Sequence, residues 1–276
     1  VSTAYITVLQ LGTILPALVA VPLAAAAGWS VSLGSWGAFA LIAALPWVAL
    51  LWVERRKDAA LALTHDQAVT TADEAPELML PTHSGNVWRS PVAWGMALMF
   101  GMTSLVSYAM FTWLPKLMVE AGANPAFGGS MVALFSALGL VSSLGMPTLA
   151  ARLRNPFPLV LACAASHLCG FAGLLWAPMA LPLLWVSLVG LGASTFPPAL
   201  TLVNLRPRTP AGSAALSGFM QGVGYGLSCL GPVLFGWLHE YSHGWELPFA
   251  FLALCVGVML AGAWRACRPG LLEDRW

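Results

Sequence analysis

The chain contains 276 residues, of which 59% are hydrophobic and 8% are charged, and its formal net charge is +1. Because about a quarter of the residues in an ordinary soluble domain are charged, this composition excludes a typical soluble enzyme and predicts a protein that lies mostly in a lipid bilayer. The near-neutral charge gives no reason to expect a nucleic acid as a partner. The five cysteines show no metal-ligand spacing, so we expect free thiols and no cofactor.

Six long stretches contain no Asp, Glu, Lys or Arg, and a helix needs ~20 apolar residues to cross a hydrocarbon core. The first and fourth stretches are each long enough for two crossings, and each has a turn signal at its middle, at Gly28-Trp29-Ser30 and at 178–182. We therefore predict an all-α, multi-pass membrane helix bundle. Its eight transmembrane helices are expected at 4–27, 31–53, 91–114, 127–150, 157–177, 180–204, 213–238 and 247–267.

The positions of the basic residues predict the orientation of these helices. If eight helices cross in order, eleven of the twelve Lys and Arg residues fall on one side of the membrane, and only Lys116 falls on the other. Basic residues favour the cytoplasmic side. We therefore expect a bacterial inner-membrane protein with both termini in the cytoplasm.

Residues 54–90 differ from the rest, because they hold ten of the 23 charged residues. We interpret them as a cytoplasmic linker between 1–53 and 91–268, with 269–276 as a cytoplasmic tail. His65, Asp66 and His83 lie in this linker and are expected to be solvated rather than catalytic. Two helices precede the linker and six follow it, and the chain begins with Val, so we interpret it as a fragment that lacks upstream helices.

The predicted helix 213–238 carries two stripes of small or polar residues. One stripe, spaced four, four and three residues apart, shares a single helix face, and it consists of Ser217, Gln221, Tyr225 and Ser228. Such a face is typical either of a solute pathway or of polar contacts between helices. The other stripe repeats a GxxxG pattern, which predicts close packing against another helix, at Gly218, Gly222 and Gly226. Gly231-Pro232 predicts a break in the helix.

Further hydroxyl groups lie on the predicted helices 91–114, 127–150 and 180–204. Pro197-Pro198 interrupts the last of these, and transporters often place solute sites at broken helices. Together with the polar stripe, these groups are expected to line a solute pathway. The predicted pathway residues are Ser104, Ser107, Tyr108, Thr112, Ser136, Ser194, Thr201, Ser217, Gln221 and Tyr225.

His167 is the only ionisable side chain deep inside a predicted helix, and such a group is a functional candidate by default. It could bind a ligand or a proton, but we favour a histidine that is hydrogen-bonded between helices. Four tryptophans near helix ends are expected to form an interfacial aromatic belt, namely Trp113, Trp176, Trp237 and Trp245. No Ser-His-Asp, HExxH or paired-carboxylate arrangement is visible, so we do not expect an enzyme.

Several strings resemble one known family. They are Leu-Arg-Pro-Arg-Thr-Pro at 205–210, Ala-Ala-Leu-Ser-Gly-Phe-Met-Gln-Gly-Val-Gly-Tyr at 214–225, Gly231-Pro232, Gly-Trp-Leu-His-Glu at 236–240 and Gly244-Trp245. These strings resemble the branch of the major facilitator superfamily that comprises cyanate permeases and 2-nitroimidazole transporters. The resemblance implies that the eight helices correspond to helices five to twelve of a fold built from two six-helix halves. Residues 1–53 would then be the last two helices of the N-terminal half, and 91–268 the C-terminal half.

One motif departs from the family pattern. Members of this branch carry an Asn-Leu-Arg-Pro-like string in their first helix, which would supply a positive charge to an anion. This chain has a similar string only at 204–207, at the cytoplasmic end of a predicted helix. We interpret Arg206 as a topological anchor rather than an anion ligand.

The resemblance implies a secondary transporter that moves a small solute, either a cyanate-like anion or a nitroimidazole-like compound, by alternating access. Its partners would be the lipid bilayer, the solute and a coupling proton. Two alternatives stay open. One is a drug or metabolite efflux pump, and the other is a truncated, inactive or accessory membrane fragment.

Overall fold

A computed structural model describes residues 2–46, 52, 87–153, 155–195, 199, 202–203, 206–268 and 272. The chain divides into two units, one formed by Val1–Val21 with Gly85–Trp276 and the other by Pro22–Ser84. Every described element is helical, as expected from the composition. Most of the predicted linker, including His65, Asp66 and His83, lies outside the described residues.

Two helical segments precede the linker. Helix α1 spans Ser2–Ala27, and a second helical segment covers Trp29–Pro46. Between them Gly28 has a φ of 87°, a left-handed conformation that residues with a Cβ rarely adopt. The turn predicted at Gly28 is therefore confirmed.

Three long helices follow the linker: α3 (Pro91–Glu120), α4 (Pro125–Arg152) and α5 (Phe157–Trp176). The Ser90 hydroxyl accepts a hydrogen bond from the Ala93 N–H, and Pro91 stands at the first helical position, where its missing N–H costs nothing. Helix α3 is longer than predicted, because it continues through Pro115 to Glu120. Pro115 removes only one backbone hydrogen bond, so the helix can continue beyond it.

The two helices predicted to be broken are broken. Helix α6 spans Pro182–Gly192 and tightens into the 3₁₀ segment η2 (Ala193–Thr195). Pro197 and Pro198 have no N–H to donate to the carbonyls of Ala193 and Ser194, which explains the end of the α-helix.

The second break separates α8 (Pro210–Ser228) from α9 (Leu230–Ser242). The ring of Pro232 would clash with the carbonyl of Ser228, four residues earlier, in a continuous helix. The break therefore falls at Cys229, slightly before the predicted position. The Thr209 hydroxyl caps the start of α8 at the Gly212 N–H, 3.0 Å away, and α10 (Glu246–Cys267) completes the fold.

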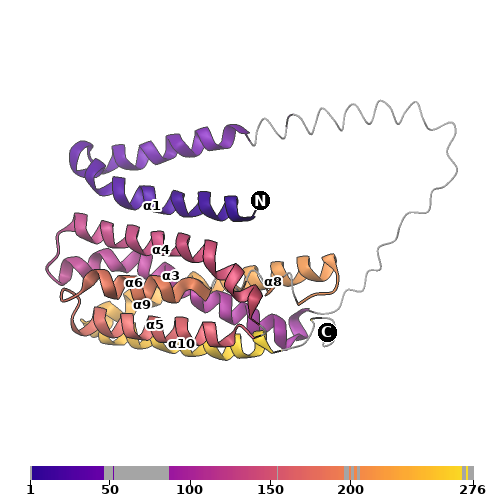
Figure 1. Cartoon of the computed structure of the whole chain (residues 1–276). Helices are drawn as coiled ribbons and strands as arrows, with labels where there is room; N and C mark the ends of the chain where they lie inside the picture. Colours follow the sequence, from indigo (N-terminus) through magenta and orange to yellow (C-terminus); the bar gives the residue numbers. More distant parts are fainter. Residues whose placement is uncertain are drawn as a thin grey trace, which may run out of the picture. The chain divides into compact units, whose positions relative to one another are not determined.

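Helix α3 is the central helix of the core and packs against α4, α8, α9, α10 and η2. Figure 1 shows α3 to α10 lying side by side with nearly parallel axes. Among the described residues, five helices are long and apolar enough to cross a membrane, and α8 with α9 is interrupted by its break. The architecture is the expected multi-pass helical bundle.

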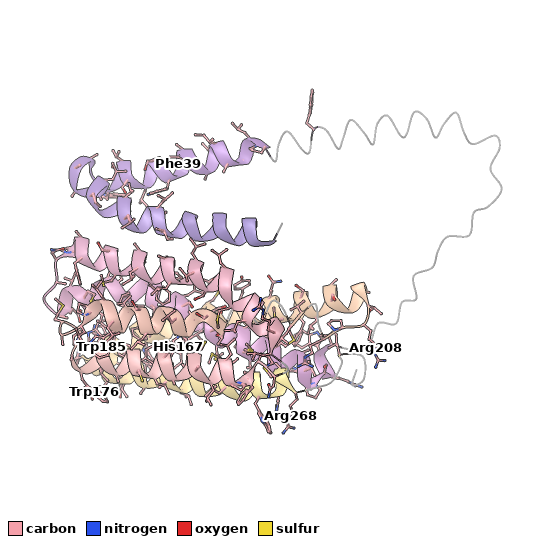
Figure 2. The ribbon with its side chains drawn as sticks, viewed as in Figure 1. Phe39, His167, Trp176, Trp185, Arg208 and Arg268 are labelled. Carbon is pink, nitrogen blue, oxygen red and sulfur yellow. The ribbon has the colours of Figure 1, made fainter. Side chains whose placement is uncertain are left out.

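The two ends of this bundle differ in charge. Figure 2 shows Arg208 and Arg268 at one end and Trp176 at the other. We call the first end the arginine end and the second the Lys116 end, because α3 carries Lys116 near its C-terminus. Arg206 also lies at the arginine end, where partial burial lowers the pKa of its guanidinium below its ordinary value. Its backbone carbonyl accepts a hydrogen bond from the Leu272 N–H, which suits an anchoring role.

Candidate solute pathway

Helix α8 presents an open face formed by Ser217, Gly218, Gln221, Gly222, Tyr225 and Gly226. Gln221 Nε2 donates to Ser217 Oγ at 2.7 Å, so the two polar side chains are joined along the helix. Tyr225 is 38% exposed, and its ring meets that of Phe100 of α3 edge to face at 5.1 Å. The described structure therefore brings the three predicted residues of α8 together on one face, where Tyr225 is exposed and Ser217 and Gln221 are partly buried.

Residues of α3 extend this surface on one side. Tyr108 is 41% exposed and lies within electrostatic range of Cys229, at the break between α8 and α9. Thr112 is also exposed, and its hydroxyl donates to the Tyr108 carbonyl at 2.9 Å. Ser107 is partly buried and donates to the Thr103 carbonyl at 3.0 Å. Ser104 is buried, and its hydroxyl has no hydrogen-bond partner among the described residues.

The predicted residues of α4 and η2 lie inside the bundle instead. Ser136 is buried and donates to the Val132 carbonyl at 2.9 Å. Ser194 is buried and hydrogen-bonded to Ser142 of α4. The next residue, Thr195, is hydrogen-bonded to Thr103 of α3 at 2.7 Å. These bonds hold the broken segment η2 against α3 and α4, and Thr201 lies outside the described residues.

The glycine stripe does not make the predicted helix contact in the described part of the chain. A Cβ added at Gly218, Gly222 or Gly226 would meet no atom within 4 Å. The close approach is made by another stripe of α8, where a Cβ on Gly224 would lie 2.5 Å from the Phe100 ring. Ser228 Oγ continues this stripe by donating to the Gly101 carbonyl at 3.1 Å. The same helix thus packs on one stripe and exposes the other.

The expected interhelical hydrogen bond of His167 is also absent. The side chain is 0% exposed, and neither ring nitrogen has a hydrogen-bond partner in the described structure. A Cβ added at Gly192 would lie 2.5 Å from the imidazole, so the ring packs flat against the end of α6.

A cavity of about 610 Å³ lies at the Lys116 end between α1, α3 and α4. Its walls are mainly apolar, with Phe111 and Val132 among them, and Lys116 and Glu120 are its charged residues. This volume falls within the range that binds small molecules. None of the predicted pathway residues lines this cavity.

A polar cluster that the sequence analysis missed adjoins this cavity. It consists of Trp113, Lys116, Glu120, His239 and Trp245, which come from α3, α9 and the start of α10. Trp113 and Trp245 are therefore partly buried and hydrogen-bonded, whereas Trp176 and Trp237 are exposed as an aromatic belt requires. The signal in the sequence was Lys116, the single basic residue predicted on its side.

No group of three or more metal-ligating side chains occurs in the part of the chain that the structure describes. The five cysteines are free thiols there, three of them buried.

Comparison with known proteins agrees with this architecture. Residues 1–228 match the Major Facilitator Superfamily. The chain is 32% identical over 268 residues to the uncharacterized transporter YycB of Bacillus subtilis, covering 96% of this chain and 62% of that protein. It is 35% identical over 173 residues to the cyanate transport protein CynX of Escherichia coli, covering 62% of this chain and 45% of that protein.

A third relative is the 2-nitroimidazole transporter of Escherichia coli, 32% identical over 173 residues, which covers 62% of this chain and 44% of that protein. No solved structure matches the chain. The chain belongs to the Major Facilitator Superfamily, in the branch that includes these cyanate and 2-nitroimidazole transporters. It spans between 44% and 62% of the length of these three relatives.

Proposed function

We propose that this protein is a secondary transporter that moves a small solute across the bacterial inner membrane by alternating access. The observation that carries the proposal is the open face of α8, because Tyr225 and three glycines are exposed there and the polar side chains of Ser217 and Gln221 are partly buried beside them. Exposed polar groups are costly against lipid, and they face water-filled cavities in membrane proteins. The family and its named relatives support the same function.

The proposed substrate is a cyanate-like anion or a nitroimidazole-like compound. Gln221 offers both a donor and an acceptor, and Tyr108 and Tyr225 offer phenolic hydroxyls. These groups suit a small planar solute that is neutral or carries one negative charge. The breaks at η2 and Cys229 lie within helices that border these groups, and broken helices allow one half of a helix to move without the other.

The test measures uptake of radiolabelled cyanate and of 2-nitroimidazole in cells that express the full-length protein. Changing Gln221→Leu removes both hydrogen-bonding groups, and we expect uptake to fall on the order of tenfold, since an unpaired polar group costs about 1–3 kcal/mol. Tyr225→Phe should lower uptake by a smaller factor. The control is Tyr241→Phe, which removes a more exposed phenol from the end of α9 and should leave uptake unchanged.

Uptake by vector-only cells that equals uptake by expressing cells, for both solutes, would contradict this substrate class. Loss of solute from preloaded cells, without uptake, would instead identify an exporter. A reporter fused to the C-terminus tests the orientation that the arginine end predicts, with the 54–90 linker and both termini in the cytoplasm.

A further inference from the structure

The cluster at the Lys116 end joins three helices through one carboxylate and one imidazole. Glu120 Oε1 of α3 lies 3.5 Å from His239 Nε2 of α9, and Glu120 Oε2 accepts a hydrogen bond from Trp245 Nε1 at 3.0 Å. The imidazole stacks on the Trp245 ring with centroids 3.9 Å apart. The His239 side chain is 12% exposed and that of Glu120 is 41% exposed, so water reaches the pair.

The hydrogen bond of His239 to the backbone places one of its ring protons. His239 Nδ1 lies 3.1 Å from the Gly244 carbonyl oxygen, which can only accept. Nδ1 therefore carries a proton, and a neutral imidazole would present the lone pair of Nε2 to the Glu120 carboxylate. Two acceptors at this distance repel each other. The observed approach of Nε2 to Oε1 is favourable only when one additional proton lies between the two side chains.

Two further groups contact the Glu120 carboxylate. Lys116 Nζ lies 3.7 Å from Glu120 Oε1, and with Trp245 it supplies two donors to the carboxylate. Both donors face the same carboxylate that approaches His239 Nε2. The other charged groups near this end are Glu240 on α9, His243 at the end of α9 and Glu246 at the start of α10, all of them exposed.

The cluster also lies where a change in charge can act on helix movement. Helix α9 is separated from α8 by the break at Cys229. Pro232 lies in the first turn of α9, and its carbonyl accepts a hydrogen bond from Trp113 Nε1 of α3 at 2.8 Å. Glu120 and His239 add a second connection between α3 and α9, near the far end of α9. Glu120 also borders the cavity of about 610 Å³.

We propose that Glu120 and His239 form a proton-binding site at the Lys116 end, and that the bound proton ties α9 to α3 and slows transport. The ligand is a proton from the solution on that side of the membrane, which the distribution of basic residues predicts to be the outside. The effect on transport rests on the function proposed above, whereas the binding site does not. Histidine is suited to this role because its ordinary titration falls near physiological pH.

The first experiment needs no solute. The full-length protein is placed in lipid nanodiscs, and the fluorescence of Trp245 is obtained by subtracting the Trp245→Phe variant between about pH 8 and about pH 5. A protonated imidazole ring that stacks on an indole quenches the indole fluorescence more than a neutral imidazole ring does. We expect Trp245 fluorescence to fall at low pH, and this change to be lost in His239→Gln.

The matched control is His243→Asn, which removes the neighbouring histidine four residues along the chain. Its φ is 53°, a conformation that asparagine tolerates, so this variant should fold and keep the fluorescence change. A change that persists in His239→Gln, or that disappears in His243→Asn, would overturn the assignment of the proton site.

The second experiment measures transport of labelled cyanate or 2-nitroimidazole into vesicles while the pH is changed only at the Lys116 side. We expect the rate to fall several-fold at low pH in the unchanged protein, and to be independent of pH in Glu120→Gln. Because His239 is intact in Glu120→Gln, the Trp245 fluorescence should still respond to pH in that variant. The transport rate of Glu120→Gln therefore tests the connection between α3 and α9, and its Trp245 fluorescence tests proton binding by the imidazole.

If transport by Glu120→Gln still depends on pH, the proposed connection between α3 and α9 is refuted. If neither solute is transported but Trp245 fluorescence follows His239, the proton site stands and the proposed substrate class fails. If His239→Gln does not give a single peak in size-exclusion chromatography, the decision rests on Glu120→Gln, which retains an acceptor for Trp245.

Discussion

The exposed surface of α8 and the exposed surfaces of α5, α6 and α10 differ in the residues that they present. Helix α8 exposes mainly alanine and glycine, with Tyr225 as its only large exposed side chain among the described residues, and the polar side chains of Ser217 and Gln221 are partly buried beside it. The other three helices expose large apolar groups, such as Leu161, Leu183, Leu254 and Trp264. Lipid tails contact large apolar side chains favourably, whereas a solute pathway needs space and hydrogen-bonding groups. The comparison therefore separates a surface suited to lipid from one suited to solute.

The largest expected effect is the difference in the yield of folded protein when an arginine is placed on each of the two surfaces. Leu254, which is 67% exposed, lies near the middle of α10, and an arginine at a lipid-facing helix centre costs about 2.5–3.5 kcal/mol. We expect Leu254→Arg to reduce the yield of folded protein in the membrane fraction strongly. Gly222→Arg should insert normally but block transport, because its side chain would enter the proposed solute pathway. Equal loss of folded protein in both variants would show that both surfaces face lipid.

Replacing a glycine by alanine should change the free energy of unfolding differently at a helix contact and on the open face, and we expect this difference to be smaller than that between the arginine variants. A Cβ on Gly262 of α10 would lie 2.8 Å from the Gly95 carbonyl oxygen of α3, so Gly262→Ala must push the two helices apart. We expect a loss of about 1–3 kcal/mol in the free energy of unfolding. Gly222→Ala meets open space and should leave stability unchanged or raise it by up to about 1 kcal/mol. Thermal unfolding in detergent measures both, and a destabilised Gly222→Ala would indicate that a helix covers this face.

The smallest expected effect concerns the polar contact that holds η2. Thr195→Val removes the hydrogen bond to Thr103, and bonds between membrane helices contribute about 0.6 kcal/mol on average. The control, Thr112→Val, loses only a bond to a carbonyl of its own helix. We expect a slightly lower unfolding temperature for Thr195→Val alone. A larger loss in Thr112→Val would mean that the exposed surface of α3 is packed rather than open.

The amino-acid sequence by itself determined the fold class and the approximate helix boundaries. Runs of about 20 uncharged residues can satisfy their backbone hydrogen bonds in lipid only as helices. Ser90-Pro91 and Thr209-Pro210 mark helix starts through local hydrogen bonds, and Pro232 marks a break through a local steric clash. These effects depend on residues within a few positions of each other, so they can be read along the chain.

Only the tertiary structure decided which stripe of α8 packs and which stays open. Gly218, Gly222 and Gly226 follow the spacing expected for packing, but α3 meets α8 at Gly224 and Ser228 instead. The contact between Glu120 and His239 was likewise invisible, because it joins residues far apart in the chain. Helical periodicity defines the faces of a helix, but the neighbouring helix that covers a face is set by the packing of the whole bundle.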